Sequence, residues 1–300
     1  MSPHPAELPL VIVIGDAALD YTIEIAQGPH PDEKVPVRSS TRGLGGTGAN
    51  AAAQVVKLGG RCSLISAIGD DPLGDCILAE LDEVGIERDH VVRHSGSSTM
   101  CTIVRRETGS LDDSERHVYV DLGVGAEISL GDSAVLRSAE RIYVSYAPQV
   151  VAPLLDLGLG KNLIVGLEHW MVDESLIDRL HQVGLIVTNA AGLAVLASAE
   201  VDLDVPLVVT HGSKDVEIRR RGAIVEAVPA ISSEVVDATG AGDSFAGALT
   251  FAVTAGASLS EAVRLAVLVA GMSTSRVGAQ AGQPSVKEVA AMAGVGILPG

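Results

Sequence analysis

The sequence predicts an α/β fold in which a parallel sheet is sandwiched between helices. The first observation is the apolar run of residues 8–14, which is continuous, rich in β-branched residues and closed by Gly15-Asp16. A run without polar alternation is typical of a strand buried on both faces. The second observation is that such runs alternate with helix-like segments through most of the 300 residues, which is the pattern of α/β proteins.

The remaining elements follow from the same pattern. Further strands are predicted over residues 62–68, 141–145, 162–167, 184–188 and 206–210. Helices are predicted between them over residues 49–58, 72–84, 148–157, 174–182 and 190–199. Two long helices rich in Ala, Val and Leu are predicted over residues 242–255 and 259–275. The second opens with Ser258-Leu259-Ser260-Glu261, which has the spacing of a capping box.

Two regions, residues 20–42 and 91–121, interrupt the alternation. They hold extended stretches over residues 21–26, 35–40, 99–106 and 115–121, with polar turns and no helix between them. Four such stretches predict a small β-sheet appended to the core, where it would cover a ligand site at the carboxyl edge of the strands. Ordinary surface hairpins are the alternative that this pattern leaves open.

Composition excludes several classes of function. With 21 Lys+Arg against 38 Asp+Glu, the formal net charge is −17, which disfavours nucleic-acid partners and anionic membranes. Two Phe, one Trp and four Tyr are too few for base-stacking platforms. The three cysteines (Cys62, Cys76 and Cys101) show no CxxC spacing, as expected in a reducing compartment. With neither a basic signal-peptide region nor a bilayer-spanning stretch, we expect a cytoplasmic protein.

The motif richest in chemical information is Asp237-Ala238-Thr239-Gly240-Ala241-Gly242-Asp243-Ser244-Phe245. A loop of small residues at a helix N-terminus exposes backbone N–H groups, and these together with the helix dipole stabilise a dense negative charge. Asp243 falls in the first turn of that helix. A carboxylate beside an anion hole is suited to accept the proton of a hydroxyl that attacks a phosphoryl group. A glycine-rich helix cap is the structural alternative.

A second glycine loop, Gly45-Gly46-Thr47-Gly48-Ala49-Asn50, opens an earlier helix. It lacks the Lys-Ser/Thr ending of a Walker A loop, and no G-x-G-x-x-G follows the first strand. A P-loop and a Rossmann dinucleotide site are therefore disfavoured. Gly45 and Gly46 would let backbone N–H groups approach a ligand hydroxyl, and Asn50 offers both a donor and an acceptor.

Together, these two motifs make the chain resemble the ribokinase/PfkB family of carbohydrate and nucleoside kinases, over essentially all 300 residues. The resemblance implies one ribokinase-like domain over residues 1–300, with three α/β/α layers and a mostly parallel central sheet. It also implies a small β-sheet lid built from about residues 20–42 and 91–121. The implied activity is the ATP- and Mg²⁺-dependent phosphorylation of a hydroxyl on a sugar or sugar-like substrate.

The family's site residues map onto this chain position by position. The resemblance implies that Asp243 is the catalytic base and that Gly240, Ala241 and Gly242 form the anion hole. It implies that the substrate is bound by Asp20, Gly45, Gly46 and Asn50. A solvated strand-end carboxylate is the alternative for Asp20, and a helix cap is the alternative for Asn50.

The nucleotide side matches less closely. The implied nucleotide contacts are Asn189, Thr210 and Gly212. Asp215 stands where the family's nucleotide loop ends in glycine, and Gly192 stands where the Asn-x-x-Glu element has the glutamate that organises magnesium-bound water. Asp237 and Glu168 are candidate replacements for that glutamate. Part of the family also binds a monovalent cation such as K⁺, and the matching positions here are Asp237, Thr239, Ser273 and Gly278.

The substrate remains open at this point. Tyr146 and Thr47 stand where ribokinase has a glutamate and a lysine, which disfavours ribose without nominating another sugar. Basic residues near the expected lid could bind a sugar phosphate; they are Lys34, Arg38, Arg42, Arg105 and Arg106. The alternative is that they only offset an acidic surface. A nucleoside kinase is one alternative. Another is a catalytically weakened sensor that binds sugar or nucleotide, which Gly192 and Asp215 favour. The edge of the lid sheet leads us to expect a homodimer.

Overall fold

The computed structural model describes residues 8–26, 32–106, 115–171, 174–199, 203–231 and 235–293. Within these residues the main body is one nine-stranded sheet with the order β13-β12-β11-β10-β9-β8-β1-β4-β5. Its strands are β1 (Leu10–Ile14), β4 (Arg61–Gly69), β5 (Glu87–His94), β8 (Arg141–Val144), β9 (Leu163–Leu167), β10 (Leu185–Asn189), β11 (Leu207–Thr210), β12 (Val216–Arg220) and β13 (Ala223–Val228). The pairs from β5 to β11 are parallel, and β12 and β13 add an antiparallel edge.

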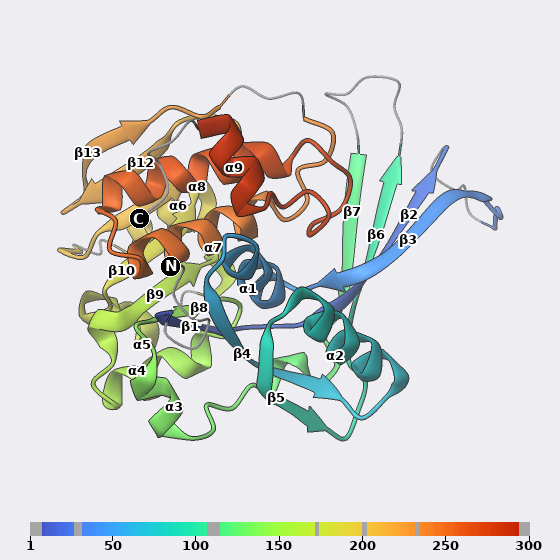
Figure 1. The fold of residues 1–300 in the computed structure, drawn as a ribbon, viewed down its shortest axis with the longest axis horizontal. Helices are drawn as coiled ribbons and strands as arrows, with labels where there is room; N and C mark the ends of the chain where they lie inside the picture. The colour runs from blue at the N-terminus through green and yellow to red at the C-terminus, as the bar shows by residue number, and fades with distance from the viewer. Residues whose placement is uncertain are drawn as a thin grey trace.

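Helices cover both faces of this sheet, so the predicted three-layer α/β/α architecture is confirmed (Figure 1). The helices are α1 (Thr47–Lys57), α2 (Pro72–Val84), α3 (Ser133–Ser138), α4 (Val151–Asp156), α5 (Glu174–Ile177), α6 (Ala190–Ser198), α7 (Ala241–Thr254), α8 (Leu259–Ser273) and α9 (Val286–Ala293). Strand β1 shows how the layers form. Val11 and Val13 face the core shared with α1, α7 and α8, whereas Ile12 and Ile14 face the core shared with α3 and α4, as the two-residue period of a strand requires.

Helix boundaries follow local chemistry closely. The predicted capping box opens α8: the backbone N–H of Ser258 donates to Glu261 Oε2 at 2.9 Å, and the N–H of Glu261 donates to Ser258 Oγ at 3.3 Å. The predicted helix over residues 72–84 is α2, whose N-cap is Asp71. Two predicted helices are shorter than expected. Residues 148–150 form a 3₁₀ turn before α4, and residues 180–182 form a separate 3₁₀ turn after α5.

The four extended stretches predicted outside the main alternation come together in a second, four-stranded sheet with the order β3-β2-β6-β7. Its strands are β2 (Ala18–Ile25), β3 (Val37–Gly45), β6 (Thr99–Arg106) and β7 (Glu115–Asp121). The β2–β6 pair is parallel and the other two pairs are antiparallel. The sheet projects from the body beside α1 (Figure 1). Because β2 and β6 pair directly, the alternative of separate surface hairpins is wrong.

The boundaries of this second sheet differ from the prediction. Residues 91–94 belong to β5 and pair with β4 in the large sheet. Residues 18–19 and 43–45 lie in the small sheet, where Ala18 pairs with Gly45. The reason is compositional, since β5 reads Glu-Arg-Asp-His-Val-Val-Arg-His. An edge strand with that many polar residues carries little hydrophobic signal.

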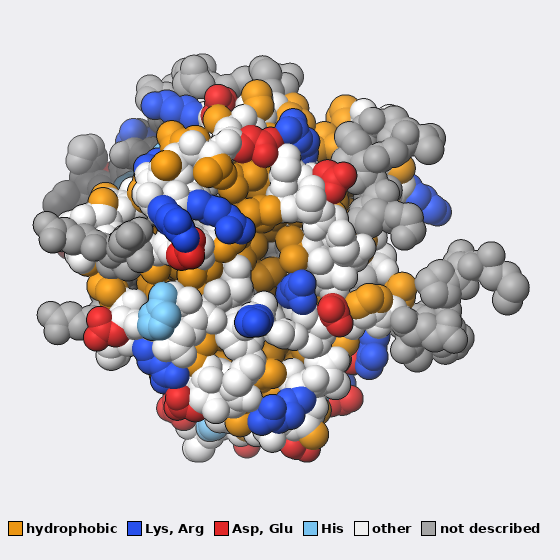
Figure 2. Space-filling view, turned by 90° about the vertical axis from the view of Figure 1, so that its left-hand side faces the viewer, with side chains coloured by type: hydrophobic (Ala, Val, Ile, Leu, Met, Phe, Trp, Pro, Cys, Tyr) orange, Lys and Arg blue, Asp and Glu red, His pale blue; other side chains and the backbone are white. Residues whose placement is uncertain are grey.

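The surface of the described residues shows no concentration of one charge on the face drawn in Figure 2. Basic, acidic and apolar side chains are interspersed there. No helix within the described ranges is long and apolar enough to cross a bilayer.

Candidate active site

A cavity lies at the carboxyl ends of β8, β9 and β10, where they face the start of α7. Its lining includes residues from several parts of the chain; they are Thr47, Ser145, Tyr146, Glu168, Asn189, Thr210 and Asp243. The carboxyl edge of a parallel sheet is the usual place for a ligand site in such folds. The cavity therefore brings Thr47 of the second motif together with Gly242 and Asp243 of the first and with two residues of the predicted nucleotide side. The predicted substrate-binding residues are not among those that line it; they are Asp20, Gly45, Gly46 and Asn50.

Asp243 lies in the first turn of α7 and is held by a neighbouring helix. The side-chain Nδ2 of Asn50 in α1 donates to Asp243 Oδ2 at 2.9 Å. Burial raises the pKa of Asp243 to about 7; the hydrogen bond from Asn50 lowers it, and the nearby carboxylates of Asp16, Asp20 and Glu168 raise it further. A carboxyl group with a pKa near neutrality can take up and release a proton under ordinary conditions.

The loop before Asp243 presents an open helix N-terminus. Gly240 is the N-cap of α7 and has a φ of 73°, in the left-handed region, and no described side chain caps the helix. A Cβ at Gly240 would also lie 2.8 Å from the Cβ of Ala279, whereas nothing lies within 4 Å of one at Gly242. The first N–H groups of a helix have no partner inside it. The N–H of Ala241 donates to the Ala238 carbonyl at 3.3 Å, so the predicted anion hole is formed by the N–H groups of Gly240, Gly242 and Asp243.

Asn50 is fixed by contacts at both ends of its amide, and only 4% of it is exposed. Its Oδ1 accepts a hydrogen bond from Gln280 Nε2 at 3.1 Å, which orients Nδ2 towards Asp243. The Asn50 carbonyl also accepts a bond from Gln283 Nε2 at 2.7 Å. Gly46, not Asn50, is the N-cap of α1. The helix-cap interpretation of Asn50 is therefore wrong.

Asp20 and the glycines of the second motif meet where β2 pairs with β3. A Cβ at Gly45 would lie 2.0 Å from Asp20 Oδ1. Gly46 has a φ of 88°, and a Cβ there would lie 2.8 Å from the Asp16 carbonyl oxygen. Burial raises the pKa of Asp20 to about 6, although a hydrogen bond with the Cys101 thiol lowers it. Asp20 is thus held inside the structure, and the interpretation as a solvated strand-end carboxylate does not fit.

A buried group of polar residues that sequence reasoning missed lies beneath this site. Asp16, only 7% exposed, accepts hydrogen bonds from Thr47 Oγ1 at 2.8 Å and from the Gly48 N–H at 3.2 Å. Thr47 Oγ1 also lies 2.8 Å from Ser145 Oγ. Since the single Thr47 proton goes to Asp16, Ser145 must donate to Thr47. Burial raises the pKa of Asp16. Its place directly after the first strand is the sequence signal that would have found it.

On the nucleotide side, Asn189 has both ends of its amide engaged. Its Oδ1 accepts the N–H groups of Ala191 and Gly192, each at 3.0 Å, and its Nδ2 donates to Glu168 Oε2 at 3.1 Å. Thr210 lines the same cavity. Gly212, with a φ of 66°, is not among the lining residues, so the structure does not bring it to the cavity.

The glycine at position 192 is linked to a second residue. A Cβ there would lie 2.0 Å from Thr188 Oγ1, and that hydroxyl donates to the Leu167 carbonyl at 2.6 Å. A glutamate at position 192 would therefore require Thr188 to move. Glu168, next to Leu167, is the carboxylate that lines this part of the cavity. One carboxylate with phosphate oxygens is a donor set that suits Mg²⁺, so Glu168 fits that ion, whereas Asn189 Oδ1 already accepts two N–H groups and Asn189 instead orients Glu168.

The positions implied for a monovalent cation do not fit one. Asp237 Oδ1 accepts the N–H of Thr239 at 3.0 Å and its hydroxyl at 2.6 Å, and Oδ2 accepts the Gly278 N–H at 2.9 Å. The guanidinium Nη1 of Arg105 lies 3.5 Å from Oδ2. The Ser273 hydroxyl donates to the Ala270 carbonyl at 2.8 Å. Donors therefore already surround the Asp237 carboxylate.

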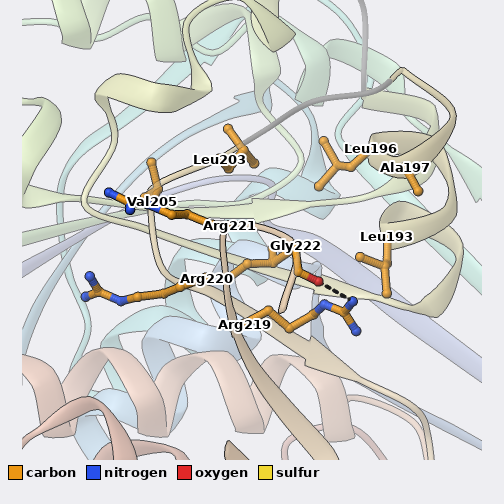
Figure 3. A pocket seen from close by; sticks show the side chains of 10 residues that line it. Leu193, Leu196, Ala197, Leu203, Val205, Arg219, Arg220, Arg221 and Gly222 are labelled. Carbon is orange, nitrogen blue, oxygen red and sulfur yellow. Dashed lines mark hydrogen bonds between the residues drawn. The ribbon is translucent and has the colours of Figure 1, made fainter. Parts of the chain in front are cut away.

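Other candidate residues have structural partners. Arg105 is directed to Asp237, and Arg42 lies over the Tyr21 ring with 5.0 Å between guanidinium carbon and centroid. A second cavity, between α6 and the β11–β12 edge, is lined by apolar side chains and by Arg219, Arg220 and Arg221 (Figure 3). Arg219 Nη2 donates there to the Gly222 carbonyl at 2.8 Å. None of the predicted site residues lines this cavity.

Comparison with known proteins gives a consistent result. The model of the pfkB family carbohydrate kinases matches residues 8–154 and 180–286. A ribokinase of Lactococcus lactis is 29% identical, with 94% of this chain and 96% of that protein covered. The bifunctional protein HldE of Caulobacter vibrioides is 31% identical over 89% of this chain, which spans 60% of that protein.

Solved structures show the same fold. Arabidopsis thaliana ribokinase, solved with ribose and ATP, superposes with a TM-score of 0.81 at 22% identity, covering 96% of this chain and 100% of that one. A Burkholderia thailandensis nucleoside kinase, solved with inosine, superposes with a TM-score of 0.79 at 21% identity, covering 94% and 97%.

Proposed function

Because the chain belongs to the pfkB family of carbohydrate kinases, we propose that it transfers a phosphoryl group from ATP to a hydroxyl of a small sugar or sugar-like molecule. The observation that carries this proposal is the position of Asp243. It lies at the open N-terminus of α7, is held by Asn50 at 2.9 Å, and has a pKa of about 7. A proton acceptor and an anion hole on adjacent residues are what phosphoryl transfer to an alcohol requires.

In this mechanism Asp243 accepts the proton of the attacking hydroxyl. A base with a pKa near the working pH combines a useful ionised fraction with enough basicity to take the proton. The N–H groups of Gly240, Gly242 and Asp243 stabilise the negative charge on the phosphoryl group during transfer. The protein supplies these donors in a fixed arrangement, so they need no reorganisation when the charge develops.

Substrate hydroxyls bind on the side of the cavity formed by the second motif. Asp20 and the backbone at Gly45 and Gly46, which lie in contact with each other, form hydrogen bonds with these hydroxyls, and Asn50 contacts Asp243. Asp16 fixes Thr47, and Thr47 in turn orients Ser145. The Ser145 hydroxyl donates its hydrogen bond to Thr47 and also contacts the Tyr143 hydroxyl, so its oxygen offers the substrate one remaining acceptor site.

ATP binds on the other side of the cavity, at Asn189 and Thr210. Mg²⁺ bound there would neutralise charge on the phosphate oxygens. Glu168 is the residue that would hold this ion in place of the absent glutamate at position 192, because its carboxylate lines the cavity and contacts Asn189. The small sheet acts as the lid, within one kinase domain over residues 1–300. A cytoplasmic location and a homodimer also belong to the proposal.

Two substrate classes are consistent with the relatives. Ribokinases support a sugar, and the nucleoside kinase solved with inosine supports a nucleoside. A specific observation keeps the nucleoside as the second candidate: Tyr146 lines the cavity in a left-handed backbone conformation, with a φ of 59°. Such a conformation is costly for a non-glycine residue, and an aromatic ring held there offers a surface for a base. The small number of aromatic residues favours the sugar.

The decisive experiment is an ADP-release assay over a panel of sugars, phosphosugars and nucleosides with Mg·ATP. We expect one class to be turned over, and Asp243→Asn to lower kcat by at least about a hundredfold, the usual effect of losing a positioned base. Glu168→Gln should need a higher Mg²⁺ concentration for half-maximal rate. No turnover across the panel, combined with ligand-dependent shifts in melting temperature, would instead identify a sensor that binds without catalysis.

A further inference from the structure

Two arginines of the small sheet contact the loop that leads into the anion hole. Arg105 of β6 and Arg116 of β7 are paired in register, on the same face of the sheet as Asp20 and Cys101. Arg105 Nη2 donates to the Val236 carbonyl at 3.3 Å and Nη1 lies 3.5 Å from Asp237 Oδ2. Arg116 Nη1 donates to Thr239 Oγ1 at 2.6 Å. Both side chains are thus directed to residues 236–239.

Charge explains this arrangement. Like charges directly opposite on neighbouring strands repel, so Arg105 and Arg116 are stable as a pair only where each meets an acceptor. Asp237 is 7% exposed, and a carboxylate buried to that degree needs a compensating positive charge. Thr239 and Gly278 provide hydrogen bonds but no net charge. Of the described residues, Arg105 is the cation that the structure pairs with Asp237.

The surrounding charges are consistent with this role. Glu24 of β2 is in register with Arg105, and its carboxylate accepts a hydrogen bond from Ser39 Oγ at 2.8 Å. Burial alone would raise the pKa of Asp237, but the hydrogen bonds from Thr239 and Gly278 and the charge of Arg105 outweigh it and lower that pKa. Asp237 is therefore ionised at neutral pH and needs its cation throughout the working range.

We propose that Arg105 supplies, from the small sheet, the positive charge that the family resemblance assigns to a monovalent cation at Asp237, so that this chain works without K⁺. Asp237 lies three residues before Gly240, the N-cap of α7. Arg105 is consequently a positioning residue, which orders the loop carrying the N–H donors when the small sheet is in place. The expected effect of Arg105 on the rate of phosphoryl transfer rests on the proposed kinase function. The proposal that Arg105 replaces K⁺ at Asp237 does not depend on that function.

The test compares wild-type protein with Arg105→Ala and Arg105→Lys in potassium chloride and in choline chloride at equal ionic strength. Melting temperature is the primary measurement because it does not depend on turnover. We expect K⁺ to leave the wild-type melting temperature unchanged within about 1 °C and to raise that of Arg105→Ala by about 3 °C, as a ligand binding the folded state does. Arg105→Lys keeps a charge and should respond to K⁺ less than Arg105→Ala.

Phosphoryl transfer gives the second measurement. In choline chloride, Arg105→Ala should lose at least about tenfold in kcat, which is in the range expected when reacting groups are slightly misplaced, and K⁺ should restore part of it. Arg106→Ala, on the opposite face of β6, is the matched control and should respond like the wild type. Stabilisation of the wild type by K⁺, or an Arg105→Ala protein as insensitive to K⁺ as the wild type, overturns the proposal. If no substrate is turned over, the melting data still decide it.

Discussion

The carboxylate of Asp243 owes its properties to four neighbours and to its burial. Burial and the nearby carboxylates of Asp16, Asp20 and Glu168 raise its pKa, and the Asn50 hydrogen bond opposes them, with a pKa of about 7 as the result. A solvated aspartate would be a base too weak to take a proton from an alcohol at neutral pH. Several acidic groups around one cavity therefore have a chemical purpose, although each adds to the repulsion among them.

The dependence of rate on pH follows from these values. We expect kcat/KM to rise between about pH 6 and pH 8 as Asp243 loses its proton. Because Asp20, with a pKa of about 6, is one of the groups acting on Asp243, the apparent values belong to the coupled pair. Asn50→Ala removes a donor to the ionised form, so its rising limb should move to higher pH. A profile that is flat from pH 5.5 to 8 would contradict the assignment of Asp243 as base.

The β2–β3 hairpin is built around a close approach between Asp20 and Gly45. A Cβ at position 45 would lie within 2.4 Å of three atoms of the Asp20 carboxyl group, whereas nothing lies within 4 Å of a Cβ at Gly43 in the same strand. The two strands pair along their whole length, with Asp20 opposite Gly43 and Ala18 opposite Gly45. The glycine at position 45 is thus required by the carboxylate and not by the strand.

Two matched variants separate these roles. Gly45→Ala should displace Asp20 and raise the substrate KM by at least about tenfold, since small misplacements of binding groups are costly. Gly43→Ala adds the same methyl group to the same strand and should leave KM within about twofold, as an ordinary surface substitution does. Steady-state kinetics on both proteins, with melting curves to verify folding, checks this. Equal KM values for the two variants would remove Asp20 from the substrate site.

The protein as a whole carries a stability cost at its active site. In Asp243 and Asp20 the folded-state pKa is raised to about 7 and about 6. A raised pKa contributes stability that is fully present below the unfolded value and is lost as the pH rises through the folded value. Carboxylates with lowered values, such as Glu288 at about 2, lose their contribution only in strong acid. Between pH 5 and 8, the carboxyl groups with raised pKa values therefore determine whether stability rises or falls with pH.

We therefore expect the melting temperature to fall as the pH rises from about 5 to 8. Asp243→Asn removes one titrating group while keeping its shape, so it should have a weaker pH dependence and a higher melting temperature than the wild type at pH 8. Asp215→Asn, in an exposed loop, is the control for loss of one charge. Parallel curves for the wild type and Asp243→Asn would contradict the raised pKa.

The elements with strong local patterns were predictable. Buried strands such as β1, the α2 helix, the capping box of α8 and the four strands of the small sheet all follow from residue type and spacing. Elements with weak patterns were missed, among them the polar strands β5 and β12 and the short helices α3 and α9. Their conformation depends on neighbouring strands and helices, because an edge strand or a short helix buries too little to show a hydrophobic period.

For the site, the sequence by itself determined the two glycine motifs, with Asp243 and Asn50 in them, since a tight loop before a helix is a local property. Only the tertiary structure decided how these groups meet. Asn50 and Asp243 are 193 positions apart, and Thr47 and Ser145 are 98 apart. The same holds for the ion pair between Arg105 and Asp237. Contacts between distant segments depend on how strands are ordered in the two sheets, and no local spacing records that order.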